Sequence, residues 1–134
     1  MIVRVWRGQT TPKNANAYLR HVTEKVLPSL LGIGGYLGAR VLRREVAERV
    51  EFLVLTQWDS WDAIRAFAGE DPDLAVIEPA AKAVLAEFDS CVRHFHVAHD
   101  SLPEAHRDSG YDRVSRGARG TCTAGRRTAR RAGS

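Results

Sequence analysis

The sequence predicts an α+β fold in which one antiparallel sheet carries helices on one of its faces. Strand-like and helix-like segments alternate along the first 99 residues, the helix-like segments are amphipathic, and the strand-like segments are apolar. The clearest stretch is residues 50–69, VEFLVLTQWDSWDAIRAFAG, where a nearly continuous apolar strand leads directly into a helix. A strand with this pattern is typical of a sheet that is covered on both faces.

The first strand is expected at Ile2–Arg7, with Gly8 as its end. The helix that follows begins near Pro12, because proline suits the first turn of a helix, where its missing N–H has no partner to lose. Pro28 should kink or end this helix, since its ring clashes with the carbonyl of the preceding turn. One apolar stripe makes the helix amphipathic: Ala15, Tyr18, Leu19, Val22 and Val26.

The centre of the chain predicts a β-hairpin followed by a second helix. A glycine-rich passage over 32–38 leads into a second strand that ends near Arg44, and the polar residues 45–49 connect it to a third strand at Val50–Trp58. Ser60 is expected to cap the next helix, and Gly69 stands where a C-terminal glycine belongs.

The last part of the domain predicts one more short helix and one more strand. Pro79 is expected to start the helix, with its inner face made by Ala80, Ala81, Val84, Leu85 and Phe88. The last strand is expected at Cys91–Ala98. The complete order is β-α-β-β-α-(α)-β, which is the split βαβ or ferredoxin-like arrangement.

The charge divides the 134 residues into two regions. Residues 1–99 hold twelve Lys or Arg and twelve Asp or Glu, whereas residues 100–134 hold eight Arg and four acids, which accounts for the whole net charge of +4. We therefore expect one folded domain over 1–99 and a basic, Arg/Gly-rich tail over 100–134 that is disordered. The balanced charge of the domain gives no nucleic-acid surface, so binding of RNA or DNA would come from the tail only.

The start of the chain, MIVRVWRG, has no apolar run of signal-peptide length, and no segment approaches the length of a membrane span. We therefore expect a cytoplasmic protein without a membrane partner. The two cysteines, Cys91 and Cys122, are too few and too far apart to indicate a disulfide framework. Cys91 is expected to be a small buried side chain.

The predicted strands are apolar on both faces, although helices on one side of a small sheet can bury only one face. On the first strand Val3 and Val5 alternate with Ile2, Arg4 and Trp6, and on the third Leu53 and Leu55 alternate with Phe52, Val54 and Trp58. The apolar face without helices needs a cover, and a second copy of the same sheet provides one. The sequence therefore predicts a homodimer that packs sheet face on sheet face.

Three segments resemble the antibiotic biosynthesis monooxygenase family of small dimeric α+β barrel proteins: MIVRVWRG, EFLVLTQWDSWDAIRAFAGEDPDLAV and VRHFHV. The resemblance covers residues 1–99 in order and leaves the tail unmatched. It implies the dimeric α+β barrel fold. The family includes cofactor-free oxygenases of aromatic polyketides, haem-degrading enzymes and members without assigned chemistry.

The resemblance can be examined residue by residue for the haem-degrading branch. Those enzymes use an Asn on the first strand, a Trp on the helix after the third strand and a haem-ligating His further along the chain. At the two later positions this sequence has Phe67 and Ile77, and its first strand contains no Asn. The resemblance therefore implies a protein without a haem cofactor.

Cofactor-free oxygenation is the reaction that the resemblance favours. A small aromatic or quinol-type metabolite enters an apolar pocket, loses a proton and meets oxygen while its anion is stabilised. The candidate catalytic residues are His94 or His96 for the proton and Arg4 for the anion. The candidate walls are Trp6, Trp58, Trp61 and Phe67. We expect no flavin, haem or metal.

Each candidate also has a structural interpretation. His94 and His96 point to one face of a strand, and they could be core or interface residues, or metal ligands with His21 as the third. Arg4 could pair with Glu51 at a dimer interface, and the tryptophans could be packing residues. The alternative function is a non-catalytic dimeric domain that binds a small hydrophobic ligand or a partner.

Overall fold

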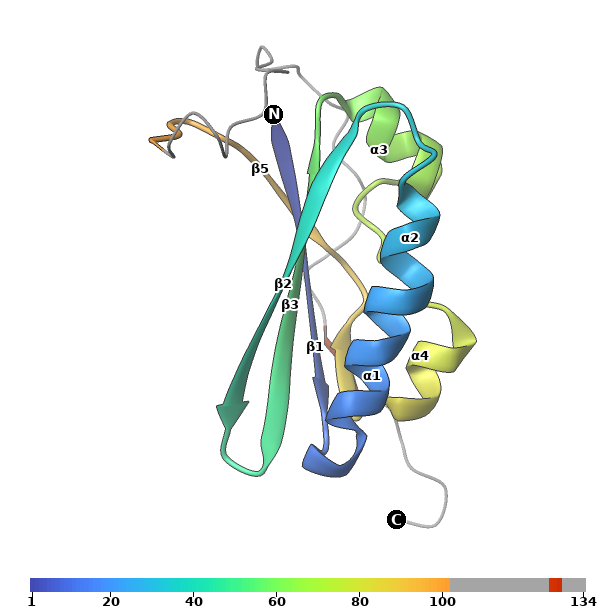
Figure 1. Cartoon of the computed structure of the whole chain (residues 1–134), viewed down its shortest axis with the longest axis vertical. Coiled ribbons are helices and arrows are strands. Elements are labelled where there is room, and N and C mark those ends of the chain that lie inside the picture. The colour runs from blue at the N-terminus through green and yellow to red at the C-terminus, as the bar shows by residue number, and fades with distance from the viewer. Residues whose placement is uncertain (102–125, 129–134) are drawn as a thin grey trace.

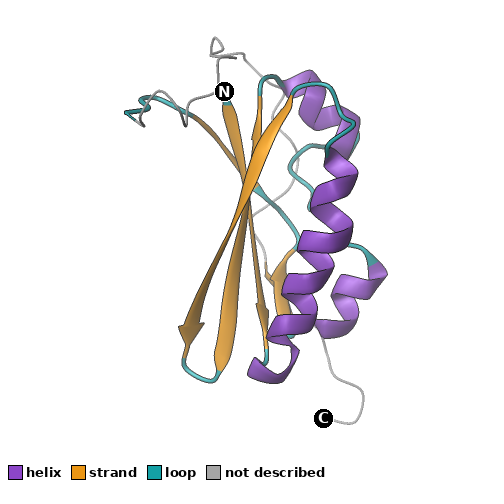
Figure 2. Cartoon of the chain, viewed as in Figure 1, coloured by secondary structure: helices purple, strands orange, loops and turns teal. Residues whose placement is uncertain are grey.

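The computed structural model describes residues 1–101 and 126–128. One antiparallel sheet carries all of the described helices on one side (Figures 1 and 2). The strands are β1 (Ile2–Thr10), β2 (Tyr36–Val46), β3 (Arg49–Trp58), β4 (Glu87–Asp89), β5 (Arg93–His96) and β6 (Arg126–Thr128). The helices are α1 (Ala15–His21), α2 (Leu27–Leu30), α3 (Trp61–Ala68) and α4 (Pro79–Val84). This confirms the ferredoxin-like α+β prediction.

Strand β1 lies in the middle of the sheet, in the order β2-β3-β1-β4-β6, with β5 also paired to β1. Its first half pairs with β5 and its second half with β4, while β3 runs along its whole other edge. The strand therefore continues beyond Gly8, where we expected it to end. Gly8 is needed for another reason: a Cβ there would lie 2.3 Å from the ring of Trp6, which covers it.

The first helical region is irregular just before Pro28 and ends at Leu30, which agrees with the expectation that this proline kinks or ends the helix. A short 3₁₀ turn (Pro12–Asn14) leads into α1, and a π-helical segment (Val22–Val26) joins α1 to α2. The Leu27 N–H donates to the carbonyl of Val22, five residues back. A π segment shifts the hydrogen-bond register by one residue, and here it lies immediately before the α2 helix that contains Pro28.

The cap predictions for α3 are confirmed. The Ser60 hydroxyl accepts a hydrogen bond from the Ala63 N–H at 3.2 Å, and Gly69 ends the helix with a φ of 90°. The helix that starts at Pro79 is shorter than expected and ends at Val84. Phe88, which we placed on that helix, belongs to β4, because Glu87 and Phe88 pair with β1. An apolar run this short fits either a helix or a strand.

Two buried clusters fill the space between the helices and the inner face of the sheet. One surrounds Phe52 and Tyr18, and the other surrounds Trp58 and Ile64. The opposite face, here called the outer face, has no described helix over it (Figure 1). Its central side chains are half-buried, and two at its margins are exposed, Leu42 at 42% and Phe95 at 54%. The expected apolar surplus on this face is present.

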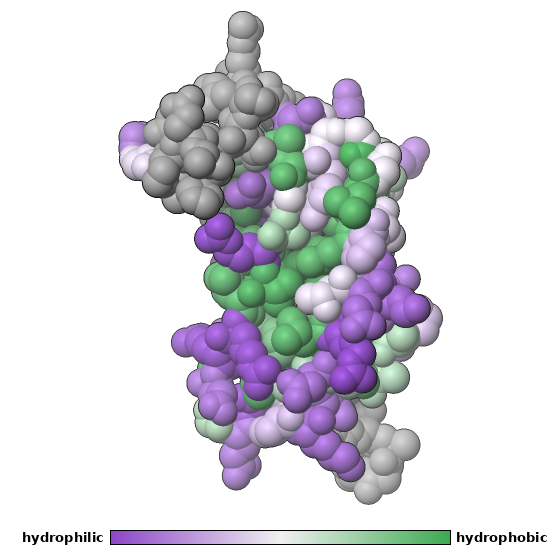
Figure 3. Space-filling view, viewed as in Figure 1, coloured by the Kyte–Doolittle hydropathy of each residue, from purple (hydrophilic) through white to green (hydrophobic). Residues whose placement is uncertain are grey.

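Charged side chains gather at the end of the sheet near the β2–β3 turn. Figure 3 shows hydrophilic surface at this end and apolar surface in the middle, between β2 and the α1–α2 region. Glu51 accepts hydrogen bonds from Arg7 at 2.5 Å and from Arg44 at 2.6 Å. The alternative in which Arg4 pairs with Glu51 is not found within the chain, because alternation along β1 puts Arg4 on the inner face and Arg7 beside Glu51.

Three further expectations concern the ends and the chemistry of the chain. The disordered tail predicted over 100–134 lies outside the described residues, apart from 100–101 and strand β6 beside β4. Within the described part, no helix is long and apolar enough to span a membrane. Cys91 is half-buried and disulfide-bonded, so the expectation of a buried apolar thiol was wrong.

Candidate functional site

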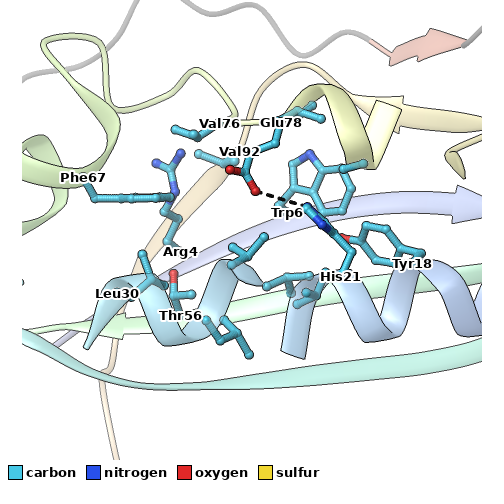
Figure 4. Close-up of a pocket in the computed structure, with 16 residues that line it drawn as sticks. Arg4, Trp6, Tyr18, His21, Leu30, Thr56, Phe67, Val76, Glu78 and Val92 are labelled. Atoms are coloured by element: carbon cyan, nitrogen blue, oxygen red, sulfur yellow. Dashed lines mark ion pairs between the residues drawn. The ribbon is translucent and has the colours of Figure 1, made fainter. Parts of the chain in front are cut away.

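A pocket of about 70 Å³ lies between the inner face of the sheet, the α1–α2 region and the segment 76–78 that precedes α4 (Figure 4). That volume has room for several water molecules. Most of its lining is apolar, and the polar or charged lining residues are Arg4, His21, Thr56 and Glu78, with the Tyr18 phenol. Val76, 47% exposed, lies at the edge of the pocket that meets solvent.

The π segment supplies much of one wall. Four lining residues lie in or directly beside this segment, His21, Val22, Val26 and Leu27, and Leu30 follows one turn later in α2. Because a π turn widens the helix locally, side chains that precede and follow it can face the same side. π segments are frequent at functional sites, and Pro28 was the signal in the sequence that the helix is irregular here.

Arg4 is the charged group of the inner face, and its side chain is held by the protein itself. It is 5% exposed and donates to the carbonyl oxygens of Pro72 and Leu74, the latter at 2.9 Å. Its guanidinium lies over the ring of Phe67, 5.5 Å from the centroid. Burial lowers the pKa of Arg4 to about 10, against the opposing effect of Asp73, so the group stays charged at neutral pH.

His94 supports Arg4 and does not line the pocket. Its Nε2 lies 3.1 Å from the Arg4 guanidinium, and its Nδ1 lies 3.3 Å from Asp73. Arg4 can only donate, so Nε2 accepts and the ring proton belongs on Nδ1, toward Asp73. Burial, and then the charge of Arg4, lower the pKa of His94 to about 4, which makes it a neutral acceptor at physiological pH.

The other sequence-predicted residues divide into two groups. Trp6 and Phe67 line the pocket with Arg4. Trp58 is fully buried behind them, where its ring stacks on Phe67 at 5.6 Å and its indole N–H donates to Thr56. Trp61 and His96 are not among the lining residues. Trp61 packs against His94 at 4.8 Å, and the exposed His96 lies 6.3 Å from the Trp61 ring.

The structure adds a polar pair that the sequence did not predict: His21, considered above only as a third metal ligand, lies beside Glu78. His21 Nε2 lies 3.2 Å from the Glu78 carboxylate, and the His21 side chain is 13% exposed. Glu78 is the residue before α4, and its side chain is 55% exposed. The only signal in the sequence was that His21 follows Tyr18 by three residues, which places both on one helix face.

The positions that matter for haem ligation also lie here. Phe67 and Ile77 both line the pocket, and neither side chain has an atom that could ligate iron. The ligand set of the haem-degrading branch therefore has no counterpart at these positions, and the residues present do not fit that mode of haem binding. Among the described residues no group of three or more His, Cys, Asp or Glu is placed to hold a metal ion.

A family model described as antibiotic biosynthesis monooxygenase matches residues 1–100. No curated protein matches the sequence. A solved structure from Bacillus cereus, provisionally described as an antibiotic biosynthesis monooxygenase, is 16% identical with a TM-score of 0.55, covering 77% of this chain and 96% of its own.

Two further solved structures show a similar fold. A monooxygenase from the gene ActVA-Orf6 of Streptomyces coelicolor, in complex with the ligand nanaomycin D, is 18% identical with a TM-score of 0.53, covering 77% of this chain and 92% of its own. The heme-degrader MhuD of Mycobacterium tuberculosis, with two hemes bound, is 22% identical with a TM-score of 0.50, covering 76% of this chain and 100% of its own. At these identities the likeness shows the shared fold alone.

Proposed function

The chain belongs to the antibiotic biosynthesis monooxygenase family, and from this premise we propose that it is a cofactor-independent monooxygenase acting on a small aromatic or quinol-type metabolite. The observation that supports the proposal most is the buried, charged Arg4 in a pocket with largely apolar walls. A positive charge in a dry site stabilises a developing anion far more than it would in water.

The reaction needs a phenol or a similar carbon acid that ionises in the pocket. Its anion gives electrons to O₂, one oxygen atom becomes a carbonyl on the ring carbon, and the other leaves as water with the substrate's O–H and ring C–H hydrogens. Arg4 stabilises the anion, while Trp6 and Phe67 form walls that exclude water and hold a flat ring.

Among the other candidates, His94 is proposed to act through Arg4. Since its Nε2 accepts from the guanidinium, His94 keeps Arg4 in position and is a positioning residue. Trp58 supports Phe67 from behind, and Trp61 packs on His94. His96 and Trp61 could contact a ligand only if it reached beyond the described pocket.

Oxygen uptake tests the proposal. The purified full-length protein is assayed with a panel of anthrones and reduced naphthoquinones, with no cofactor added and with boiled protein as the autoxidation background. Saturable uptake above that background is expected. Uptake at the background rate for the whole panel, from protein shown to be folded by circular dichroism, would contradict it.

One observation favours the alternative, a domain that binds a small hydrophobic ligand without chemistry. Arg4 already donates to two backbone carbonyls and to His94, and an arginine bound in this way also serves to fix the segment 72–74. Under this alternative the panel compounds bind, as measured by quenching of tryptophan fluorescence, but no oxygen is consumed.

We also propose a homodimer through the outer face. The apolar side chains of that face, Leu42 and Phe95 included, leave water if a second sheet covers them. Light scattering should give twice the mass of the chain, and Leu42→Asp should reduce it to the mass of one chain. A native protein that is monomeric at high concentration would contradict the proposal.

A further inference from the structure

We infer that His21 and Glu78 form the proton-accepting pair of the pocket, and that the pocket takes an aromatic diol with a hydroxyl at each end. This inference rests on the proposed function, since it assumes that the pocket binds a phenolic ligand. It assigns a proton-transfer role to two residues that are far apart in sequence, of which His21 was considered above only as a metal ligand and Glu78 not at all.

The pair lies at the opposite end of the pocket from Arg4. Figure 4 shows Arg4 beside Phe67 at one end, and His21 beside Tyr18 at the other, with Glu78 reaching toward the His21 ring. His21 Nε2 is 3.2 Å from Glu78 Oε1, but this buried nitrogen makes no hydrogen bond with the described residues. A buried polar atom without such a bond is unusual in a folded protein. A ligand in the pocket would provide the missing partner.

The chemistry of a histidine beside a carboxylate is proton transfer. When the ligand ionises, its O–H bond breaks and the electron pair stays on the oxygen. The proton forms an N–H bond with Nε2 of His21, the nitrogen that lacks a hydrogen bond within the described part of the chain. The resulting imidazolium carries a positive charge next to the Glu78 carboxylate, which stabilises it. The side chain of Glu78 is 55% exposed, so the proton can leave to solvent from this end.

His94 is a poorer acceptor for the same proton. Its Nε2 already accepts from Arg4, its Nδ1 proton faces Asp73, and its ring does not line the pocket. His21 lines the pocket and has a carboxylate on the solvent side. Of the three histidines in this region, His21 is therefore the one that is placed to take a proton from a ligand.

The two ends select the ligand. The His21–Glu78 end favours a hydroxyl that can give up its proton, and the Arg4 end favours a second oxygen that can accept a hydrogen bond from the guanidinium. Between them the walls are apolar, among them Trp6, Val22, Leu27 and Val54. A flat aromatic ring with an oxygen at both ends satisfies all of these groups, whereas a ring with one hydroxyl leaves one end without a partner.

The test combines two probes with two variants under anaerobic conditions. The probes are 2,6-dihydroxynaphthalene, with a hydroxyl at each end, and 2-naphthol, with one. Full-length native protein, His21→Gln and Glu78→Gln are compared by tryptophan-fluorescence titration, and the ultraviolet spectrum of the bound probe reports its ionised fraction. The matched controls are His99→Gln and Glu24→Gln, which replace exposed residues outside the pocket.

We expect His21→Gln to weaken binding of the diol by about ten-fold, to lower the ionised fraction of the bound diol, and to change binding of 2-naphthol by less than about two-fold. Glu78→Gln should do the same to a smaller degree. Equal losses for both probes would indicate a structural role and overturn the inference, and so would an unchanged ionised fraction in both variants. Diol binding that depends on His21, without oxygen uptake in air, would contradict the oxygenase proposal and support the pair.

Discussion

Arg4 and Arg7 are three residues apart on β1, and their side chains lie on opposite faces of the sheet. The groups that surround the two guanidinium groups differ. Arg7, on the outer face, meets carboxylates: Glu51 at 2.5 Å, Glu87 at 3.4 Å and Asp89 at 3.7 Å. Burial alone would lower the pKa of Arg7, but the hydrogen bonds to Glu51 and Glu87 and the nearby charges outweigh it and raise the pKa. Arg4, on the inner face, meets backbone carbonyls and a neutral imidazole, and its pKa is lowered.

The difference lies in what neutralises each charge. Arg7 is surrounded by acids that cancel its charge, which is the arrangement of a structural ion-pair network. Arg4 is held by dipoles, with Asp73 acting on it mainly through space. Dipoles fix a guanidinium without cancelling its charge, so Arg4 keeps a field that can act on a ligand. This difference in geometry is the reason why we propose a ligand-directed role for Arg4 and a structural role for Arg7.

Replacing Arg4 should give the largest effect. Arg4→Met keeps an unbranched apolar stem and removes the charge, so we expect oxygen uptake to fall by about 100-fold or more, the usual cost of losing one anion-stabilising group. Arg4→Lys should retain part of the activity, because it keeps a charge but loses the forked geometry. Since both variants also release Pro72 and Leu74, thermal unfolding must be measured in parallel. Full activity in folded Arg4→Met would mean that the charge has no catalytic role.

Most of the fold could be predicted from the sequence, because the signals that mark its helices and strands are local. Ser60 and Gly69 mark the ends of α3 through hydrogen bonds and a φ angle that depend on their immediate neighbours. The ambiguous elements were those that depend on distant pairing. Phe88 became part of a strand because β1 lies beside it, and Gly8 stayed inside β1 because β3 and β4 pair with it.

The candidate site could be predicted only in part, because some of its contacts join residues that are distant in sequence. Arg4, Trp6 and Phe67 could be proposed because alternation and helical spacing point them inward. His21 and Glu78 meet only after the segment before α4 has folded over the π turn, and no spacing rule connects them. The partners of Arg4, the carbonyls of Pro72 and Leu74, are backbone groups of a loop. Contacts with backbone groups cannot be predicted from the residue types.

Replacing Glu51 should have the second-largest effect, and it should act on stability alone. Glu51→Gln leaves Arg7 and Arg44 without their shared carboxylate, so we expect the free energy of unfolding to fall by about 2 kcal/mol. Hydrogen bonds from Arg44 and Arg7 lower the pKa of Glu51 despite its burial. A depressed carboxyl pKa contributes stability that is present at neutral pH and lost as the pH falls through the folded-state value.

Urea unfolding of native protein and Glu51→Gln at neutral and acidic pH checks this prediction. The difference between the two proteins should shrink toward low pH, and oxygen uptake should be equal in both. Arg44→Ala is the matched control, because the Arg44 side chain is 71% exposed and exposed pairs contribute less than about 1 kcal/mol. A loss of activity in Glu51→Gln at unchanged stability would remove the distinction between the faces.

Replacing His94 should have the smallest effect. It should distinguish a residue that positions Arg4 from one that transfers a proton. His94→Gln can still accept a hydrogen bond from Arg4, whereas His94→Phe cannot, so we expect full or nearly full oxygen uptake in the first and about a ten-fold loss in the second.

The folded-state pKa of His94 is about 4, below the usual value near 6.5. Between these values the unfolded chain binds a proton at this site and the native protein does not, so native stability falls as the pH is lowered through this range. His94→Gln should lack that part of the pH dependence while keeping its activity. If His94 itself transferred the proton, His94→Gln would be as inactive as His94→Phe.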